Sequence, residues 1–206
     1  MKKTYFGFSA MLMFVLIVSS GCTKPSDMTA TISANSDSEY MNTFEELGLG
    51  ILYDFDFRLP DADNRWVTMW VESYKNGEKE PQPITELSYG LSPKQVEEGN
   101  IGFGIINPNT DAPLLFLYAP GTTIAPQKIQ QNNSSFKVST WDYAIGDEKV
   151  ELKLGETNLL GVYRQSSKNS IRAYDLQDEN AVKQMINEDS RVLLLKIKID
   201  EAMDDN

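Results

Sequence analysis

The chain contains no histidine, and this absence sets the tightest limit on the chemistry it could perform. Without an imidazole there can be no Ser-His-Asp or Cys-His nucleophile system and no imidazole metal ligand. An enzyme would have to use paired carboxylates, as many glycosidases do. The chain has 30 acidic residues, and no local motif singles out one pair of them. We therefore expect a protein that is not an enzyme and that needs no cofactor.

Oxygen-bearing side chains gather in one turn, where Asp61, Asp63 and Asn64 follow a proline. Carboxylate and amide oxygens at alternate positions are ligands that suit Ca²⁺. The EF-hand pattern is not met, because no glycine stands at the sixth position of such a loop. Asp and Asn are also the usual residues of tight turns. The alternatives are a calcium site and an ordinary polar turn, and the turn is the better explanation.

Three aromatic residues, Trp66, Trp70 and Tyr74, fall on one side of a predicted strand over residues 65–74. An exposed row of this kind could stack on sugar rings, which present an apolar CH face. A row buried between two layers would simply belong to the core, which is the commoner case for aromatic residues. Trp141 and Tyr143 raise the same question. A site for a glycan or for the cell wall is therefore the alternative function.

A second short pattern, Gly102-Phe103-Gly104, has two of the glycines of a phosphate-binding loop. It lies within a strand pattern, lacks the further glycine and precedes no helix, so it does not predict a phosphate site. Glycines inside a strand usually mark a bulge or a close approach of another group to the backbone. We expect one of these two explanations to hold here.

Alternating apolar residues predict the strands that must position these side chains. The clearest runs cover residues 47–59, 65–74 and 191–199. Short helices are predicted at the segment that starts at Ser92 and over residues 178–188. Many short strands separated by turns predict a mainly β fold, a single β-sandwich that is immunoglobulin-like or related, with one or two short helices. Further strands are expected at residues 84–89, 101–106, 114–118, 128–130, 136–145, 150–154, 159–163 and 171–174.

The first 22 residues have the three parts of an export signal. Lys2 and Lys3 precede an apolar run over residues 6–18, and Ser19-Ser20-Gly21 leads to Cys22, the only cysteine. The apolar run is shorter than the roughly 20 residues that a spanning helix needs. This segment resembles the lipobox of bacterial lipoproteins, although Ser19 stands where that family prefers leucine.

The resemblance implies that the signal, residues 1–21, is removed and that Cys22 carries acyl chains such as palmitate. The protein would then be anchored in the cell membrane at its extracytoplasmic face. Residues 22–43 are poor in large apolar side chains and predict a flexible tether. Residues 44–200 would form the sandwich, and residues 201–206 an acidic tail. Thr23 follows the lipid site and would indicate an outer-membrane address in a cell with two membranes, so the type of envelope stays open.

The net charge of −11 argues against a nucleic acid partner, because phosphates would be repelled. Residues 87–95 and 139–147 give the chain a general similarity to uncharacterised lipoproteins of Gram-positive bacteria, which carries no activity with it. The predicted function is that of a membrane-anchored extracytoplasmic lipoprotein with a non-catalytic interaction or accessory role. Its partner would be a protein or a cell-wall glycan.

Overall fold

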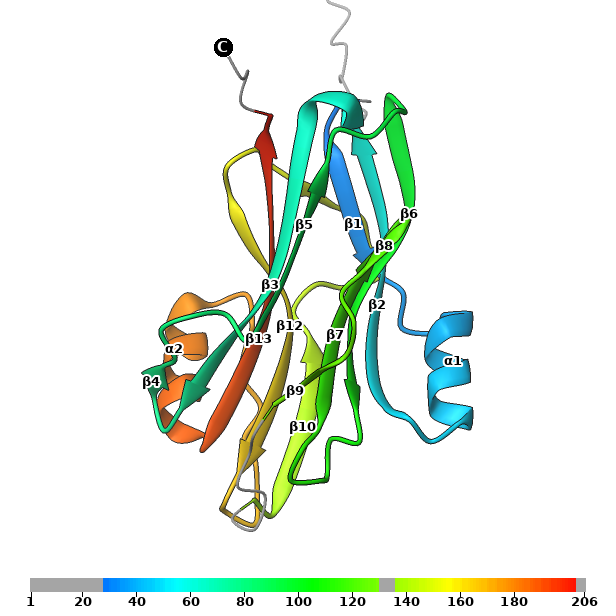
Figure 1. The fold of residues 1–206 in the computed structure, drawn as a ribbon. Coiled ribbons are helices and arrows are strands. Elements are labelled where there is room, and N and C mark those ends of the chain that lie inside the picture. The colour runs from blue at the N-terminus through cyan, green and yellow to red at the C-terminus, as the bar shows by residue number, and fades with distance from the viewer. Residues whose placement is uncertain (1–27, 130–135, 203–206) are drawn as a thin grey trace, which may run out of the picture.

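The computed structural model describes residues 28–129 and 136–202, which form two antiparallel sheets packed face to face (Figure 1). This confirms the predicted β-sandwich. The first sheet has the strand order β11 (Val150–Leu152), β1 (Ala30–Ala34), β2 (Gly50–Pro60), β6 (Val96–Ile106), β7 (Leu114–Ala119) and β8 (Thr122–Thr123), with β9 (Gln127–Lys128) also paired to β7. The second has the order β10 (Val138–Tyr143), β12 (Thr157–Ser166), β13 (Arg191–Glu201), β3 (Arg65–Lys75) and β4 (Glu78–Lys79), with β5 (Thr85–Gly90) also paired to β3.

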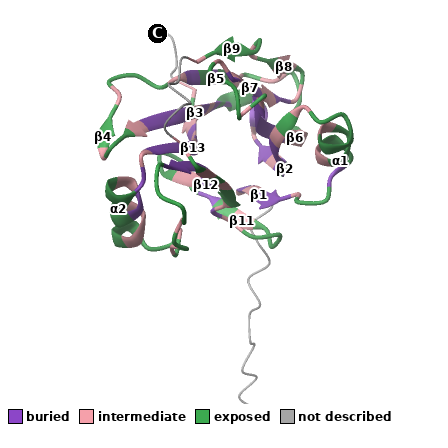
Figure 2. Cartoon of the chain, turned by 90° about the horizontal axis from the view of Figure 1, so that it is seen from below, coloured by how far each residue is buried: buried purple, intermediate pink, exposed green. Residues whose placement is uncertain are grey.

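The alternating apolar residues of the long strands fill the space between the sheets. On β2 this face carries Tyr53, Phe55 and Phe57, and all three side chains are buried. β3 and β13 supply the opposite wall in the same way, since a strand directs every second side chain to one face. Figure 2 shows the buried strands in the middle of the molecule and the exposed loops and helices around them. The principal core therefore follows the period-two pattern of the sequence.

Tyr53 connects the two sheets directly. Its hydroxyl donates a hydrogen bond of 2.6 Å to the carbonyl oxygen of Val162 on β12. A Cβ atom at Gly161 would lie only 2.8 Å from the Tyr53 ring, so the absence of a side chain there makes room for it. Because the hydroxyl is buried, this bond satisfies a group that would otherwise be costly to desolvate.

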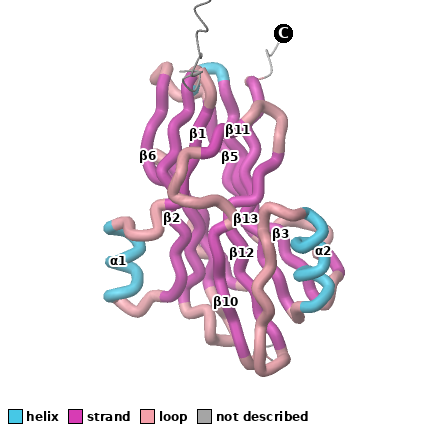
Figure 3. Tube along the Cα trace, turned by 180° about the vertical axis from the view of Figure 1, so that it is seen from behind, coloured by secondary structure: helices cyan, strands magenta, loops and turns pink. Residues whose placement is uncertain are grey.

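Two helices lie on the outer faces of the sandwich, one on each sheet (Figures 1 and 3). α1 (Glu39–Glu46) begins at Ser38, whose side chain accepts a hydrogen bond from the Met41 amide, and it packs against β2. α2 (Glu179–Glu188) was predicted from its sequence and covers a second, smaller apolar cluster on the other sheet. A short 3₁₀ helix, η1 (Ala62–Asn64), links β2 to β3.

The expected boundary of the tether was wrong. β1 lies inside residues 22–43, between β11 and β2, and α1 begins before residue 44. The sandwich therefore includes residues from Ala30 onward. β1 was not predicted because Ile32 is its only large apolar residue. Its main chain nevertheless forms hydrogen bonds to a strand on each side. The expected signal, Cys22 and the last part of the acidic tail lie outside the described residues.

Two predicted local elements are also absent from the described chain. The segment after Ser92 is not a helix. The Ser92 side chain accepts a hydrogen bond from the Lys94 amide in a local turn, and β6 starts at Val96. The preceding Leu91 has a positive φ of 52°, which belongs to a turn rather than to a helix start. Residues 171–174 form a loop on the α2 side and not a strand. Tyr174 there packs against the apolar cluster under α2, so tertiary packing explains its apolar pattern.

Candidate ligand-binding site

The predicted aromatic row lies on the outer face of β3. Val67, Met69 and other residues of the opposite face fill the core, so the intervening side chains point away from it. Trp66 keeps 39% of its surface exposed, while Trp70 and Tyr74 are half-buried. The row is thus not enclosed between the two sheets. Tyr74 is covered because it packs against the apolar cluster under α2.

Trp66 is held against the neighbouring strand by the shape of the backbone there. Gly90 on β5 pairs with Trp66, and a Cβ atom at Gly90 would lie 3.0 Å from the Trp66 ring. The indole therefore lies close over the glycine. An aromatic ring held in this way costs little conformational entropy when it binds a flat apolar surface.

Glu72 lies between the two inner aromatic residues and links them to the adjacent strands. Its side chain is only 8% exposed, and both carboxylate oxygens are occupied. Burial alone would raise the pKa of Glu72, but its hydrogen bonds and ion pairs outweigh burial and lower that pKa to about 2. The donors are Lys79 at 2.8 Å, Lys196 at 2.9 Å, Tyr74 at 2.9 Å and Trp70 at 3.2 Å.

A groove of about 950 Å³ adjoins this row, between α2, the outer face of the second sheet and the loop after β10. Tyr74 and Lys196 belong both to the groove and to the network around Glu72. Its lining combines apolar side chains with amide, hydroxyl, carboxylate and ammonium groups. The polar lining residues include Asp147, Thr157, Asn158, Gln177 and Lys183.

This arrangement is suited to binding rather than to proton transfer. A carboxylate with a pKa of about 2 and four donors stays ionised near neutral pH, so it is a poor general acid or base. The lining of the groove combines apolar side chains with scattered polar groups. Such a combination can hold a ligand that presents both apolar faces and hydroxyl groups.

The other predicted sites behave differently. Asp61 adopts a left-handed conformation, with φ of 50°, at the turn into η1, and its carboxylate forms an ion pair of 3.2 Å with Arg65. Among residues 28–129 and 136–202, no group of three or more His, Cys, Asp or Glu side chains could hold a metal ion. Asp61 thus lies in a tight turn, Asp63 and Asn64 belong to η1, and the calcium site stays a prediction.

Trp141 and Tyr143 lie on the edge strand β10. Trp141 is 38% exposed, yet its ring meets the buried Tyr53 edge-on, with centroids 5.5 Å apart. Tyr143 makes similar contacts with Tyr53 and Phe55. These two rings close one side of the core.

The network around Glu72 was not predicted, because its partners come from three strands. The sequence placed Lys196 on the polar side of its strand, but only the pairing of Lys196 with Trp70 across β13 and β3 brings it to Glu72. The sequence signal for this network was the presence of charged residues at alternate positions in two strands. That signal does not say which strands are neighbours.

The fold is a two-sheet antiparallel sandwich with a helix on each outer face, and the site described above lies on one of those faces. A family model for the YgaN domain matches residues 52–199, so the chain belongs to the YgaN domain family. No curated protein and no solved structure matches the chain. The part of the chain that the structure describes has no helix that is long and apolar enough to cross a membrane.

Proposed function

We propose that this chain is a membrane-anchored extracytoplasmic lipoprotein whose sandwich binds a partner without catalysing a reaction. The observation that carries the proposal is the outer face of β3. It offers an exposed ring and a polar groove, while its central carboxylate, Glu72, is fully engaged by four donors. Such fixed pairing supports a recognition surface, because general acid–base catalysis requires a group that can exchange its proton.

Lipid attachment at Cys22 would hold the domain close to the bilayer. Met28 is only the sixth residue after Cys22, and its carbonyl oxygen accepts a hydrogen bond of 3.2 Å from Arg65. Six residues span at most about 20 Å. Arg65 starts β3 at the end of the sandwich where β13 finishes, which would therefore face the membrane. α2 and the groove beside it lie toward the other end (Figure 1).

Metabolic labelling with an alkyne-bearing fatty acid tests the anchor. We expect label on the wild-type protein, and neither label nor membrane retention for Cys22→Ser. An unlabelled wild type, or a Cys22→Ser protein that stays in the membrane fraction, would contradict lipid anchoring. Crosslinking of the anchored protein in cells, followed by mass spectrometry, tests the interaction role: one dominant exported or membrane protein supports it. Capture of wall glycan without a protein would favour the second candidate.

That second candidate is a glycan-binding or cell-wall-binding module, which the exposure of Trp66 on the outer face of β3 favours. Co-sedimentation with purified wall glycan measures the binding. Truncating an aromatic anchor at a binding surface typically costs about 2 kcal/mol, or a factor of about 30 in affinity. We expect that loss for Trp66→Ala. Trp141→Ala is the control, because Trp141 has nearly the same exposure but lies on β10. Equal losses for the two variants would refute a site at β3.

A further inference from the structure

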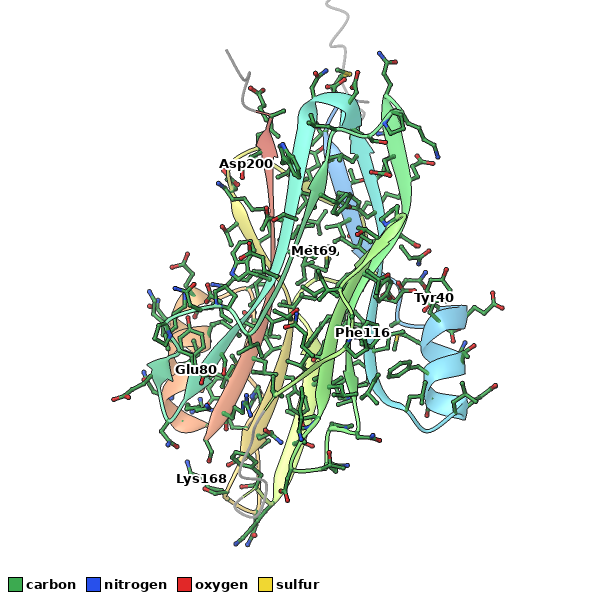
Figure 4. The ribbon with its side chains drawn as sticks, in the orientation of Figure 1. Tyr40, Met69, Glu80, Phe116, Lys168 and Asp200 are labelled. Carbon is green, nitrogen blue, oxygen red and sulfur yellow. The ribbon has the colours of Figure 1, made fainter. Side chains whose placement is uncertain are left out.

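A second groove, of about 860 Å³, lies between α1 and the outer face of the first sheet. It is separate from the groove beside α2, since the two helices cover opposite sheets (Figure 3). Its volume falls within the range of small-molecule sites, roughly 300 to 1,000 Å³. Four aromatic side chains line it: Tyr40 and Phe44 come from α1, and Phe116 and Tyr118 come from β7. Figure 4 labels Tyr40 on the helix and Phe116 on the sheet.

Two of the three glycines of β6, Gly102 and Gly104, determine how the rings from β7 lie. A Cβ atom at Gly104 would come within 2.1 Å of the Phe116 ring, and one at Gly102 within 2.4 Å of the Tyr118 hydroxyl. Both distances are far below van der Waals contact. The expectation of a close approach at these glycines is therefore confirmed. The rings lie across β6, and the space between the sheet and α1 stays open.

The four rings form a continuous aromatic lining. The Tyr40 and Tyr118 rings meet at 81° with centroids 6.2 Å apart, and the Phe44 and Phe116 centroids are 6.0 Å apart. The Phe116 and Tyr118 centroids lie 6.1 Å apart. The face of an aromatic ring carries partial negative charge and attracts an organic cation within about 6 Å.

A buried carboxylate lies directly behind this lining. Asp54 is fully buried and accepts hydrogen bonds from the Tyr118 hydroxyl at 2.8 Å, from the Asn100 amide at 3.0 and 3.2 Å and from the Phe55 amide at 3.1 Å. Tyr118 and Asn100 also line the groove. All these donors are neutral, and among the described residues no ion pair is formed by Asp54. Burial raises the pKa of Asp54, and the hydrogen bonds oppose that rise.

The charges at the groove favour one class of ligand. Glu39 is the charged residue of the lining and adds a second carboxylate at the rim. An anion would be repelled by both acids, and a neutral apolar molecule would leave the charge of Asp54 without a counter-ion. A metal ion would need several oxygen ligands, and no such cluster exists in the described residues. An organic ammonium ion can both lie over the aromatic rings and balance the charge of the carboxylates.

We infer that the groove under α1 binds a small organic cation, an ammonium group on an apolar body, whose charge lies over the aromatic rings and is balanced by Asp54 behind them. The inference concerns a different face from the proposed interaction site and does not depend on it. The ligand enters beside α1, and Tyr40, which is 55% exposed, covers it from the helix side.

Isothermal titration at low ionic strength tests the inference on the chain from residue 22 onward, with Cys22→Ser to keep it free of lipid. The probes are choline and 3,3-dimethylbutan-1-ol, which differ by the replacement of the cationic nitrogen with carbon. We expect choline to bind saturably and about 2- to 30-fold more tightly than the alcohol, because a cation over a ring gains about 0.5 to 2 kcal/mol. Equal binding of the two probes, or no saturable binding of choline, would overturn the inference.

Two variants locate the site. Tyr40→Leu removes an exposed ring without disturbing the core, and Asp54→Asn keeps the shape of the side chain while removing its charge. Each should lower choline affinity about tenfold. Leu47→Ala is the matched control: Leu47 caps the same helix, is 66% exposed and lies outside the groove. If Asp54→Asn does not fold, Tyr40→Leu alone decides. An unchanged affinity in Tyr40→Leu would refute a site under α1.

Discussion

Replacing Glu72 by glutamine is the sharpest test of the network on the outer face of β3. The side chain keeps its size, but its single oxygen can accept only one of the two hydrogen bonds that Trp70 and Tyr74 donate to different oxygens of Glu72, and Lys79 and Lys196 lose their carboxylate. The pKa of Glu72 is about 2 rather than 4.5, which corresponds to about 3 kcal/mol of folding free energy at neutral pH. Since both lysines keep some exposure and can be rehydrated, we expect Glu72→Gln to lose about 2 to 3 kcal/mol at pH 7.

The pH dependence of that loss follows from the direction of the pKa change. The pKa of Glu72 is lower in the folded protein than in the unfolded chain, so its stabilising effect is complete well above pH 4.5. It disappears as the pH falls through about 2. At pH 3.5 the unfolded chain has mostly taken up the proton and the folded protein has not. The difference in the free energy of unfolding between wild type and Glu72→Gln should therefore be about 1.4 kcal/mol smaller at pH 3.5 than at pH 7.

Urea unfolding of the two proteins at both pH values measures this double difference, in which the effects of the other acidic residues cancel. Glu156→Gln is the control, because the Glu156–Lys153 pair is long, at 3.7 Å, and its two side chains are 58% and 72% exposed. Its loss should stay below about 0.5 kcal/mol at either pH. A gap between wild type and Glu72→Gln that does not change with pH would refute the assignment of the low pKa to Glu72.

Other changes test the fold. Gly104→Ala should lose about 2 kcal/mol in urea unfolding because the new methyl group overlaps an aromatic ring of β7, whereas Gly146→Ala meets open space and should be nearly neutral; equal losses would contradict this. Tyr53→Phe removes a buried hydrogen bond between the sheets and should lose about 1 to 2 kcal/mol, and an unchanged midpoint would argue against that bond. Deleting residues 23–27 should leave the thermal unfolding curve unchanged, while extending the deletion through residue 34 removes β1 and should abolish cooperative unfolding by circular dichroism.

The long strands were predictable because each has one face in the core and one face outside it. β2, β3 and β13 place every second side chain in the core, and the burial pattern departs from alternation where the outer face is also covered, as at Val192 and Leu194 under α2. α2 was predicted because Val182, Met185 and Ile186 share one helical face, which packs on the second sheet. The local sequence pattern was enough to predict an element wherever that element packs one face on a single neighbouring layer.

Elements defined by their neighbours were not predictable in this way. β1 has little apolar surface and depends on main-chain bonds to β2 and to β11, which is distant in the sequence. α1 gave a signal that was missed: Ser38 at the N-cap is followed by Tyr40 and Phe44, four residues apart on one face. The environment of Glu72 depended on which strands are adjacent, and a single sequence with alternating charges does not determine that order.

The placement of β1 and β13 has a consequence for how the chain folds. They are the first and last strands of the described chain, and each lies inside its sheet, between β11 and β2 and between β12 and β3. The second sheet cannot close around its middle until β13, near the end of the described chain, is present, whereas the first sheet needs only the strands up to β11. Contacts between residues so far apart in sequence are slow to form, and folds dominated by them take milliseconds to seconds. In a chain that emerges from a ribosome or a translocation channel, the second sheet therefore stays open until β13 is released, and folding then completes as a late, cooperative event.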